Sequence, residues 1–248
     1  TIDWLAFTLP SCSLQDTLKA LGGDWIQSES GFRRYPVSWI TTGSDRGIGK
    51  LGTGAGRNPR EVHVDLSAGI VAPWEAGKVR TVLQWILAQQ GHLTRLDCAL
   101  DDRASLVPLA TISHAVEVGQ CVTRARQIQR ISSAFIHTGT ASGETIYFGS
   151  PQSQTKLRVY DKRLESQAKQ REDWQEYGIR WELELKQERA QVCGQVLSYL
   201  DEAVWLEFMV GILRGYVDFR DTTRDEEDEF RYRAPLLDWW LLLTDGFK

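Results

Sequence analysis

A tyrosine lies between cationic residues in the segment KLRVYDK, residues 156–162. Two apolar residues alternate there with Arg158, Tyr160 and Lys162, and alternate residues of a β-strand share one face. Neighbouring cations bind phosphate and favour the phenolate, so the tyrosine hydroxyl can attack a phosphodiester. An aromatic residue on a half-buried strand with solvated neighbours has the same pattern. We predict Tyr160 as a candidate nucleophile, with Arg158 and Lys162 stabilising the transition state.

Two acidic segments flank this tyrosine in the sequence, RLDCALD at 95–101 and IRWELELK at 179–186. In each, apolar residues alternate with charged ones, which predicts a strand with a polar face directed outward. Carboxylates one pleat apart repel each other, and a hard divalent cation removes that repulsion. Ordinary amphipathic strands with ion pairs, such as Glu184 with Lys186, have the same pattern. The candidate metal ligands are Asp97, Asp101, Glu182 and Glu184.

The histidines do not offer an alternative metal site. The chain has four, His63, His92, His114 and His137, and no two are separated by a single residue. A carboxylate-based site therefore favours Mg²⁺ or Mn²⁺ over Zn²⁺. His63 lies opposite the apolar face of its expected strand and could reach a site, but a lone strand histidine is more often structural, and we assign it no catalytic role.

The net charge of −4 is unusual for a protein that binds DNA. Five of the negative charges stand in the run at 225–229, which we expect to be a flexible loop because like charges in series repel. Residues 120–171 contain nine Lys or Arg and three Asp or Glu. Local basic surface governs phosphate contact more than whole-chain charge does, although a solvated basic face is the simpler explanation. The candidate DNA-binding residues are Arg124, Arg126, Arg130 and Lys156.

Taken in order, these segments resemble the replication initiation factor family. The resemblance rests on RLDCALD, TIYFGS at 145–150, LRVYDK and RWELELK, and IDWLAF at 2–7 and VHVDLS at 62–67 also suit it. That family includes rolling-circle initiators of plasmids and filamentous phages, and related relaxases. The resemblance implies site-specific nicking of one DNA strand, with Tyr160 forming a 5′-phosphotyrosine bond and later rejoining the strand. It places the metal ligands among the four acids named above.

The sequence is compatible with three functions. The first is a replication initiator that nicks an origin with single-stranded or hairpin character. The second is a relaxase of a mobile element with the same chemistry, and the third is a DNA-binding regulator that does not cut. The resemblance also implies a homodimer, a host helicase as partner and the cytoplasm of a bacterial cell.

The remaining residues predict an α+β fold, with a largely antiparallel sheet, flanking helices and two similar halves as one option. The chain has 248 residues, enough for one large domain or two lobes. We expect a nicking domain at 1–190 and a helical extension at 191–248. Strands are expected at 156–162 and 179–186, with a charged helix at 163–177 between them. Four widely spaced cysteines indicate reduced thiols, and no apolar run or leader indicates a membrane span or secretion.

Overall fold

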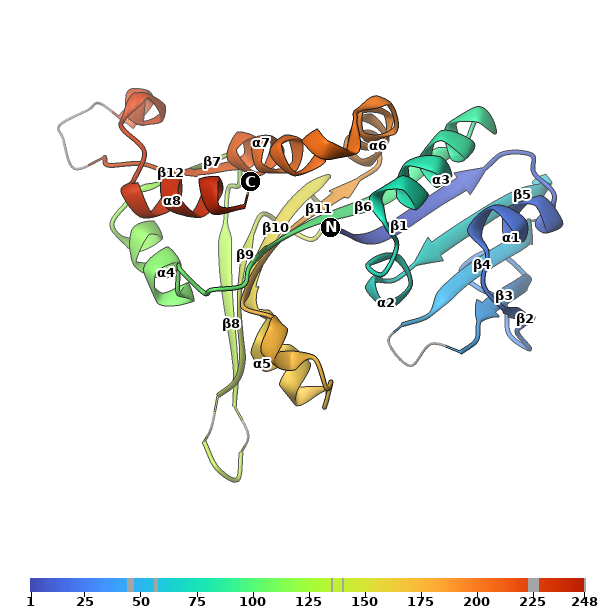
Figure 1. Ribbon diagram of the computed structural model, residues 1–248, viewed down its shortest axis with the longest axis horizontal. Coiled ribbons are helices and arrows are strands. Elements are labelled where there is room, and N and C mark those ends of the chain that lie inside the picture. The colour runs from blue at the N-terminus through green and yellow to red at the C-terminus, as the bar shows by residue number, and fades with distance from the viewer. Residues whose placement is uncertain (44–46, 56–57, 135, 140, 223–227, 248) are drawn as a thin grey trace. The chain divides into compact units, whose positions relative to one another are not determined.

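The computed structural model describes residues 1–43, 47–55, 58–134, 136–139, 141–222 and 228–247 (Figure 1). Helices flank a largely antiparallel sheet, which confirms the predicted α+β class. Ten strands are hydrogen-bonded in the order β2-β3-β4-β5-β1-β6-β11-β10-β9-β8, and β12 pairs with β7 in a second, two-stranded sheet. The chain divides into two compact units: unit 1 comprises residues 1–98 and 184–205, and unit 2 comprises residues 99–183 and 206–248.

Unit 1 begins with a strand and a short helix. Its elements are β1 (Ile2–Leu9), α1 (Leu14–Leu21), β2 (Trp25–Gln27), β3 (Val37–Thr41), β4 (Gly49–Ala55), β5 (Asn58–Leu66), α2 (Ala68–Val71), α3 (Ala76–Ala88), the first part of β6 (His92–Asp102), the end of β11 (Ile179–Lys186), α6 (Glu188–Tyr199) and a 3₁₀ turn at Glu202–Val204. Ser13 caps α1 by accepting a hydrogen bond from the Asp16 amide at 3.0 Å.

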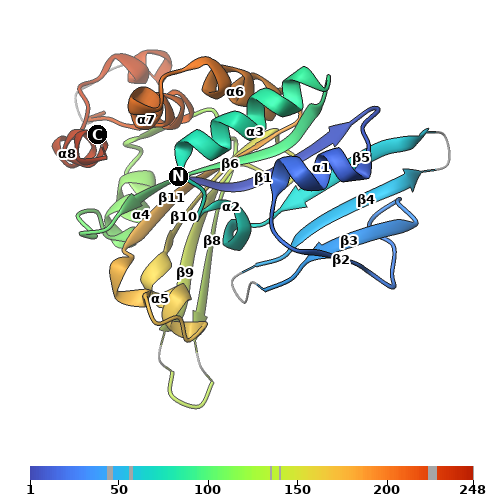
Figure 2. The ribbon, with the colours of Figure 1, turned by 45° about the vertical axis from the view of Figure 1, so that its right-hand side comes forward.

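One face of the unit 1 strands forms the core with the helices. Phe7 on β1 is fully buried and meets Trp85 of α3 edge to face, with ring centroids 6.3 Å apart. Helix α1 lies beside α3 (Figure 2), and α3 packs against α6. A hydrogen bond from Gln84 Nε2 to the Ser198 carbonyl, at 2.8 Å, joins α3 to α6.

Unit 2 contains the tyrosine segment. Its elements are the end of β6, α4 (Leu109–Glu117), β7 (Cys121–Thr123), β8 (Ile128–Ala134), β9 (Ala141–Phe148), β10 (Thr155–Asp161), α5 (Lys162–Ala168), a 3₁₀ turn at Trp174–Glu176, the start of β11, α7 (Trp205–Tyr216, except its first residue), β12 (Val217–Phe219), a 3₁₀ segment at Asp228–Arg233 and α8 (Asp238–Gly246). Strands β8 and β9 run side by side as an antiparallel hairpin (Figure 1).

The unit 2 core is rich in aromatic rings. Trp181 of β11, Phe219 of β12 and Trp240 of α8 are almost completely buried, and the Trp181 and Trp240 ring centroids are 5.3 Å apart. Asp218 accepts a hydrogen bond from the indole of Trp240 at 2.5 Å and pairs with Arg220 at 2.7 Å. The C-terminal helix is therefore fixed to the strand that carries the second acidic segment.

The helix after the tyrosine strand is shorter than expected. We predicted a helix at 163–177, but α5 ends at Ala168 and a separate 3₁₀ turn follows at Trp174–Glu176. The reason is local: Gln170 has a φ of 54°, in the left-handed region, and the Arg171 amide donates back to the Ser166 carbonyl at 3.0 Å. The charged pattern of residues 163–177 continues past Gln170, so the sequence did not indicate where the helix ends.

The two compact units follow other boundaries than the split that we expected at residue 190, so a nicking domain at 1–190 with an extension at 191–248 stays a prediction. Of the acidic run at 225–229, residues 225–227 lie outside the described residues, and the expected loop is not tested there. Within the described part of the chain, no helix is both long and apolar enough to cross a membrane.

Candidate active site around Tyr160

Strand register places Tyr160 on a defined face of unit 2. In the antiparallel pair of β9 and β10, Tyr160 lies opposite Thr145 and Arg158 lies opposite Tyr147. The intervening residues Leu157 and Val159 are fully buried on the other face. The alternation in KLRVYDK therefore has the predicted effect, because the apolar residues fix which side of the strand faces the core.

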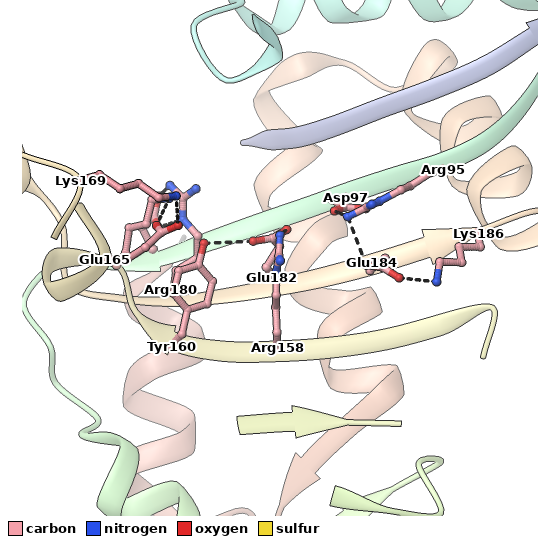
Figure 3. Close-up of polar contacts among 12 residues, drawn as sticks. Arg95, Asp97, Arg158, Tyr160, Glu165, Lys169, Arg180, Glu182, Glu184 and Lys186 are labelled. Carbon is pink, nitrogen blue, oxygen red and sulfur yellow. Dashed lines mark hydrogen bonds and ion pairs between the residues drawn. The ribbon is translucent and has the colours of Figure 1, made fainter. Parts of the chain in front are cut away.

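The Tyr160 hydroxyl meets the Glu182 carboxylate (Figure 3), and two cations lie beside the Tyr160 ring. The hydroxyl donates to Glu182 Oε2 of the neighbouring strand β11 at 3.2 Å. The Arg158 guanidinium carbon and the Lys162 Nζ lie 5.7 and 5.6 Å from the ring centroid. Cations at these distances are attracted to the ring face and favour a developing phenolate. Both cations lie near the ring, although Lys162 reaches it from the following helix and not from the strand.

Glu182 is buried, contrary to the outward face predicted for its strand. Its side chain is 0% exposed, and its other carboxylate oxygen pairs with Arg158, whose side chain is 32% exposed. Trp181 and Leu183 on the opposite face are also buried, as predicted. Arg158 and Tyr160 of β10 bind this carboxylate, and a buried carboxylate is stable only when paired and hydrogen-bonded.

Lys162 belongs to a helix rather than to the strand. It is the first residue of α5, whose N-cap Asp161 accepts from the Leu164 amide at 2.9 Å. The buried Lys162 ammonium binds Glu165 at 2.5 Å, and Lys169 binds the same carboxylate (Figure 3). Burial alone would raise the pKa of Glu165, but hydrogen bonds from the two ammonium groups outweigh it and lower this pKa to about 2. Glu165 therefore stays ionised and fixes Lys162 beside the Tyr160 ring.

Asp101 is the second candidate metal ligand in unit 2. Arg180 of β11 binds it through two nitrogens, with Nε at 2.6 Å from Oδ1 and Nη2 at 2.9 Å from Oδ2. This bidentate pair fixes both planar groups and links the end of β6 to the start of β11. Asp101 and Glu182 each have their own arginine within unit 2.

In unit 1 the other two candidate ligands share one arginine. Nη2 of Arg95 lies 2.5 Å from Asp97 Oδ2 and 3.1 Å from Glu184 Oε2 (Figure 3). Asp97 is 0% exposed, and Lys186 also binds Glu184 at 2.5 Å, the ion pair that the sequence allowed. The Arg95 guanidinium also stacks over the Trp4 ring at 4.2 Å. Asp97 and Glu184 thus converge on a single positive charge.

Carboxylate oxygens are donors that a hard divalent cation prefers, but the two unit 1 carboxylates are bound here to the Arg95 guanidinium. In the described residues, however, no three His, Cys, Asp or Glu side chains are gathered as a metal-ion site. A site made from all four acids therefore stays a prediction. His63 lies elsewhere, stacked between Phe32 and Tyr35, and burial lowers its pKa to about 4.

The candidate DNA-binding residues do not form one surface. Lys156 lies on the same face of β10 as Tyr160, whereas Arg130 lies opposite Ile146 and so points to the other face of the hairpin. Arg130 also pairs with Glu117 at the end of α4, at 2.5 Å. Arg124 and Arg126 are exposed in the connection between β7 and β8. The structure groups only Lys156 with the tyrosine.

Tyr147 also lies on the site face. Its place two residues after Thr145 in TIYFGS is compatible with a core or a stacking position. Strand register places it directly opposite Arg158 and on the same face as Tyr160. Its position after Thr145 in TIYFGS could have indicated this, but only once the pairing of β9 with β10 was known.

Comparisons with known proteins agree with this fold. The family model described as replication initiation factor matches residues 91–247. A putative DNA relaxase, NicK of Bacillus subtilis strain 168, is 33% identical over 137 residues, which is 54% of this chain and 38% of that protein. The chain thus spans well under half the length of this curated relative. The structure of a rolling-circle replication initiator from Geobacillus stearothermophilus matches with a TM-score of 0.80 at 21% identity, covering 100% of this chain and 95% of that one. At this identity the likeness shows the fold.

Proposed function

The chain belongs to the replication initiation factor family, and on that premise we propose that it nicks and rejoins one DNA strand at a specific origin to start rolling-circle replication. The observation that carries the proposal is the environment of Tyr160. A hydroxyl held by a buried carboxylate, with two cations beside its ring, suits a nucleophile that attacks a phosphodiester.

In the proposed reaction, Tyr160 gives its proton to Glu182, the carboxylate to which its hydroxyl already donates. The phenolate oxygen then forms a bond to phosphorus, and the bond from phosphorus to the 3′ oxygen breaks. The 3′ oxygen takes the proton from Glu182 through water, which restores the carboxylate, and it can prime a polymerase, while the 5′ phosphate stays on the tyrosine. Reversal of these steps rejoins the strand and restores the hydroxyl.

Arg158 and Lys162 have distinct parts in this proposal. Arg158 is partly exposed and can turn from Glu182 toward a phosphate once Glu182 has taken the proton and lost its charge. Lys162 is buried and fixed by Glu165, so it acts on the tyrosine ring and its phenolate from a constant position. Arg158 would stabilise the negative charge of the phosphate, and Lys162 would stabilise the phenolate of Tyr160.

We further propose that the reaction uses Mg²⁺ or Mn²⁺. Of the predicted set, Asp97, Asp101, Glu182 and Glu184, the carboxylates of Asp97 and Glu184 share a cationic partner, and they would hold the ion. When bound, it would polarise the scissile phosphate and screen its charge. Glu182 contacts the nucleophile and would serve as the base, and Asp101 is bound by Arg180.

The test uses supercoiled DNA carrying a candidate origin, incubated with the protein and Mg²⁺ or Mn²⁺ and resolved by denaturing electrophoresis. A covalent protein–DNA adduct is expected for the wild-type chain and for Tyr147→Phe, a matched control on the same strand face. Tyr160→Phe should form none, because only the hydroxyl is removed. An adduct that persists in Tyr160→Phe overturns the assignment of the nucleophile.

A relaxase function is the second candidate, because a relative that shares 33% identity is named as a putative DNA relaxase. The chemistry at Tyr160 would be the same, and only the origin would differ. Incubation with transfer origins and replication origins side by side separates the two. Binding to either without any adduct would instead indicate a regulator that does not cut.

A further inference from the structure

We propose that Tyr147 and Lys156 form a stacking platform for an unpaired DNA base next to the phosphate that Tyr160 attacks. The inference rests on the proposed function and specifies its substrate as single-stranded at this point. It assigns a binding role to two residues of the β9–β10 pair, which the register places on the nucleophile's face.

The position of Tyr147 supports the proposal. Tyr147 lies directly opposite Arg158, so Tyr160 is its diagonal neighbour on the same face. Diagonal neighbours across an antiparallel pair are about 7–8 Å apart. Successive stacked nucleotides advance by about 3.4 Å along one strand. A base on Tyr147 therefore belongs to a nucleotide one or two steps from the scissile phosphate.

The surroundings of Tyr147 suit a base. Its side chain is partly exposed, and the Lys156 ammonium lies 4.1 Å from its ring centroid. On the other side, the exposed Gln129 of β8 lies opposite Tyr147, and β8 is the edge strand of the sheet. An aromatic ring with an adjacent cation binds both the π-face of a base and its phosphate, as in sequence-tolerant binding of single strands.

The other face of the hairpin cannot serve in the same way. Ile146 and Phe148 are buried there against the core, and Arg130 is bound to Glu117 of α4. Tyr147 is thus the aromatic residue of β9 that is partly exposed on the side of Tyr160, while its neighbours in the sequence stabilise the core.

The test measures binding rather than cutting, so that it is separable from the proposed function. The probe is a twelve-nucleotide oligothymidylate with one 2-aminopurine, placed at each position in turn. Tyr160→Phe serves as background to prevent cleavage. Stacking on Tyr147 should quench the fluorescence, and Tyr147→Ala should weaken binding roughly 5- to 150-fold and remove the quenching. Tyr147→Phe keeps the ring and should retain both, whereas Lys156→Gln should weaken binding and lower the salt slope by about 0.7.

Tyr199 of α6 supplies the matched control, since its side chain is 84% exposed in unit 1 and Tyr199→Ala should change nothing. A second measurement uses the protein that keeps Tyr147 and crosslinks it by light to a 5-iodouracil oligonucleotide. Mass spectrometry should then locate an adduct on Tyr147, and this result does not depend on whether Tyr147→Ala folds well. Unchanged affinity and quenching in Tyr147→Ala, or a crosslink elsewhere only, overturns the platform. If wild-type protein forms the covalent adduct while Tyr147→Ala binds normally, the nicking proposal stands and the platform fails.

Discussion

Replacing Glu182 with glutamine tests the central contact of the site. The change keeps the size of the side chain but removes the negative charge that binds Arg158 and accepts from Tyr160. The Glu182 side chain is completely buried, so water cannot reach this position to solvate the Arg158 guanidinium once the carboxylate charge is lost. Arg158 would be left as a cation with a weakened partner.

The magnitude follows from the burial of both partners. Removing one member of a buried ion pair costs about 3–5 kcal/mol. The Arg158 side chain is 32% exposed, so water recovers part of that cost. We expect Glu182→Gln to lower the free energy of unfolding by about 2–3 kcal/mol, since the tyrosine can still donate to the amide oxygen. For a chain of this length, that loss lowers Tm by about 4–12 °C.

The assay is chemical or thermal unfolding of four proteins: wild type, Glu182→Gln, Arg158→Gln and the double variant. The double variant should be more stable than the two separate losses predict, with a coupling of about 1–3 kcal/mol. Glu117→Gln is the matched control, because its pair with Arg130 is exposed and its loss should leave the transition in place. If Glu182→Gln unfolds at the same midpoint as wild type and its coupling to Arg158→Gln is zero, the buried pair of Glu182 and Arg158 does not stabilise the site.

Three further predictions use other properties of the chain. The pKa of His63 is lowered from 6.5 to about 4, mainly by burial, so the unfolded chain binds more protons at this residue between these values. Its contribution to stability should fall as pH drops from about 6.5 to 4, by on the order of 1–3 kcal/mol, and His63→Gln should remove this part of the pH dependence. Nicking should stop in EDTA and return with Mg²⁺ or Mn²⁺, and a full rate in EDTA would exclude the metal. Changing Arg124 and Arg126 together to Gln should weaken DNA binding across sequences and lower the salt slope by about one per lost contact; unchanged affinity and slope would make them a solvated face.

The alternating segments were predictable because a period of two fixes which side of a strand faces the core. Leu157 and Val159, and likewise Trp181 and Leu183, are buried as the pattern predicted. The α+β class followed from runs of such segments between helices.

What the sequence did not reveal depends on strand pairing. Glu182 is buried where Arg158 and Tyr160 of the neighbouring strand β10 bind it, and nothing in its own strand encodes those neighbours. Register likewise decides that Arg130 points away from Tyr160 and that Tyr147 points toward its face. Helix α5 ended early because Gln170 adopts a left-handed conformation that residue type alone did not indicate.

The division into discontinuous units has a consequence for synthesis on the ribosome. Unit 1 takes its last segment from residues 184–205, and unit 2 takes its last from 206–248. Neither can be completed until most of the chain has emerged, and the long-range strand contacts involved form slowly. The N-terminal part of the nascent chain, including β1 to β5, therefore has unpaired strand edges while the rest of the chain is synthesised. Co-translational chaperones should bind this chain during that interval, and fragments cut between 98 and 184 should aggregate rather than fold.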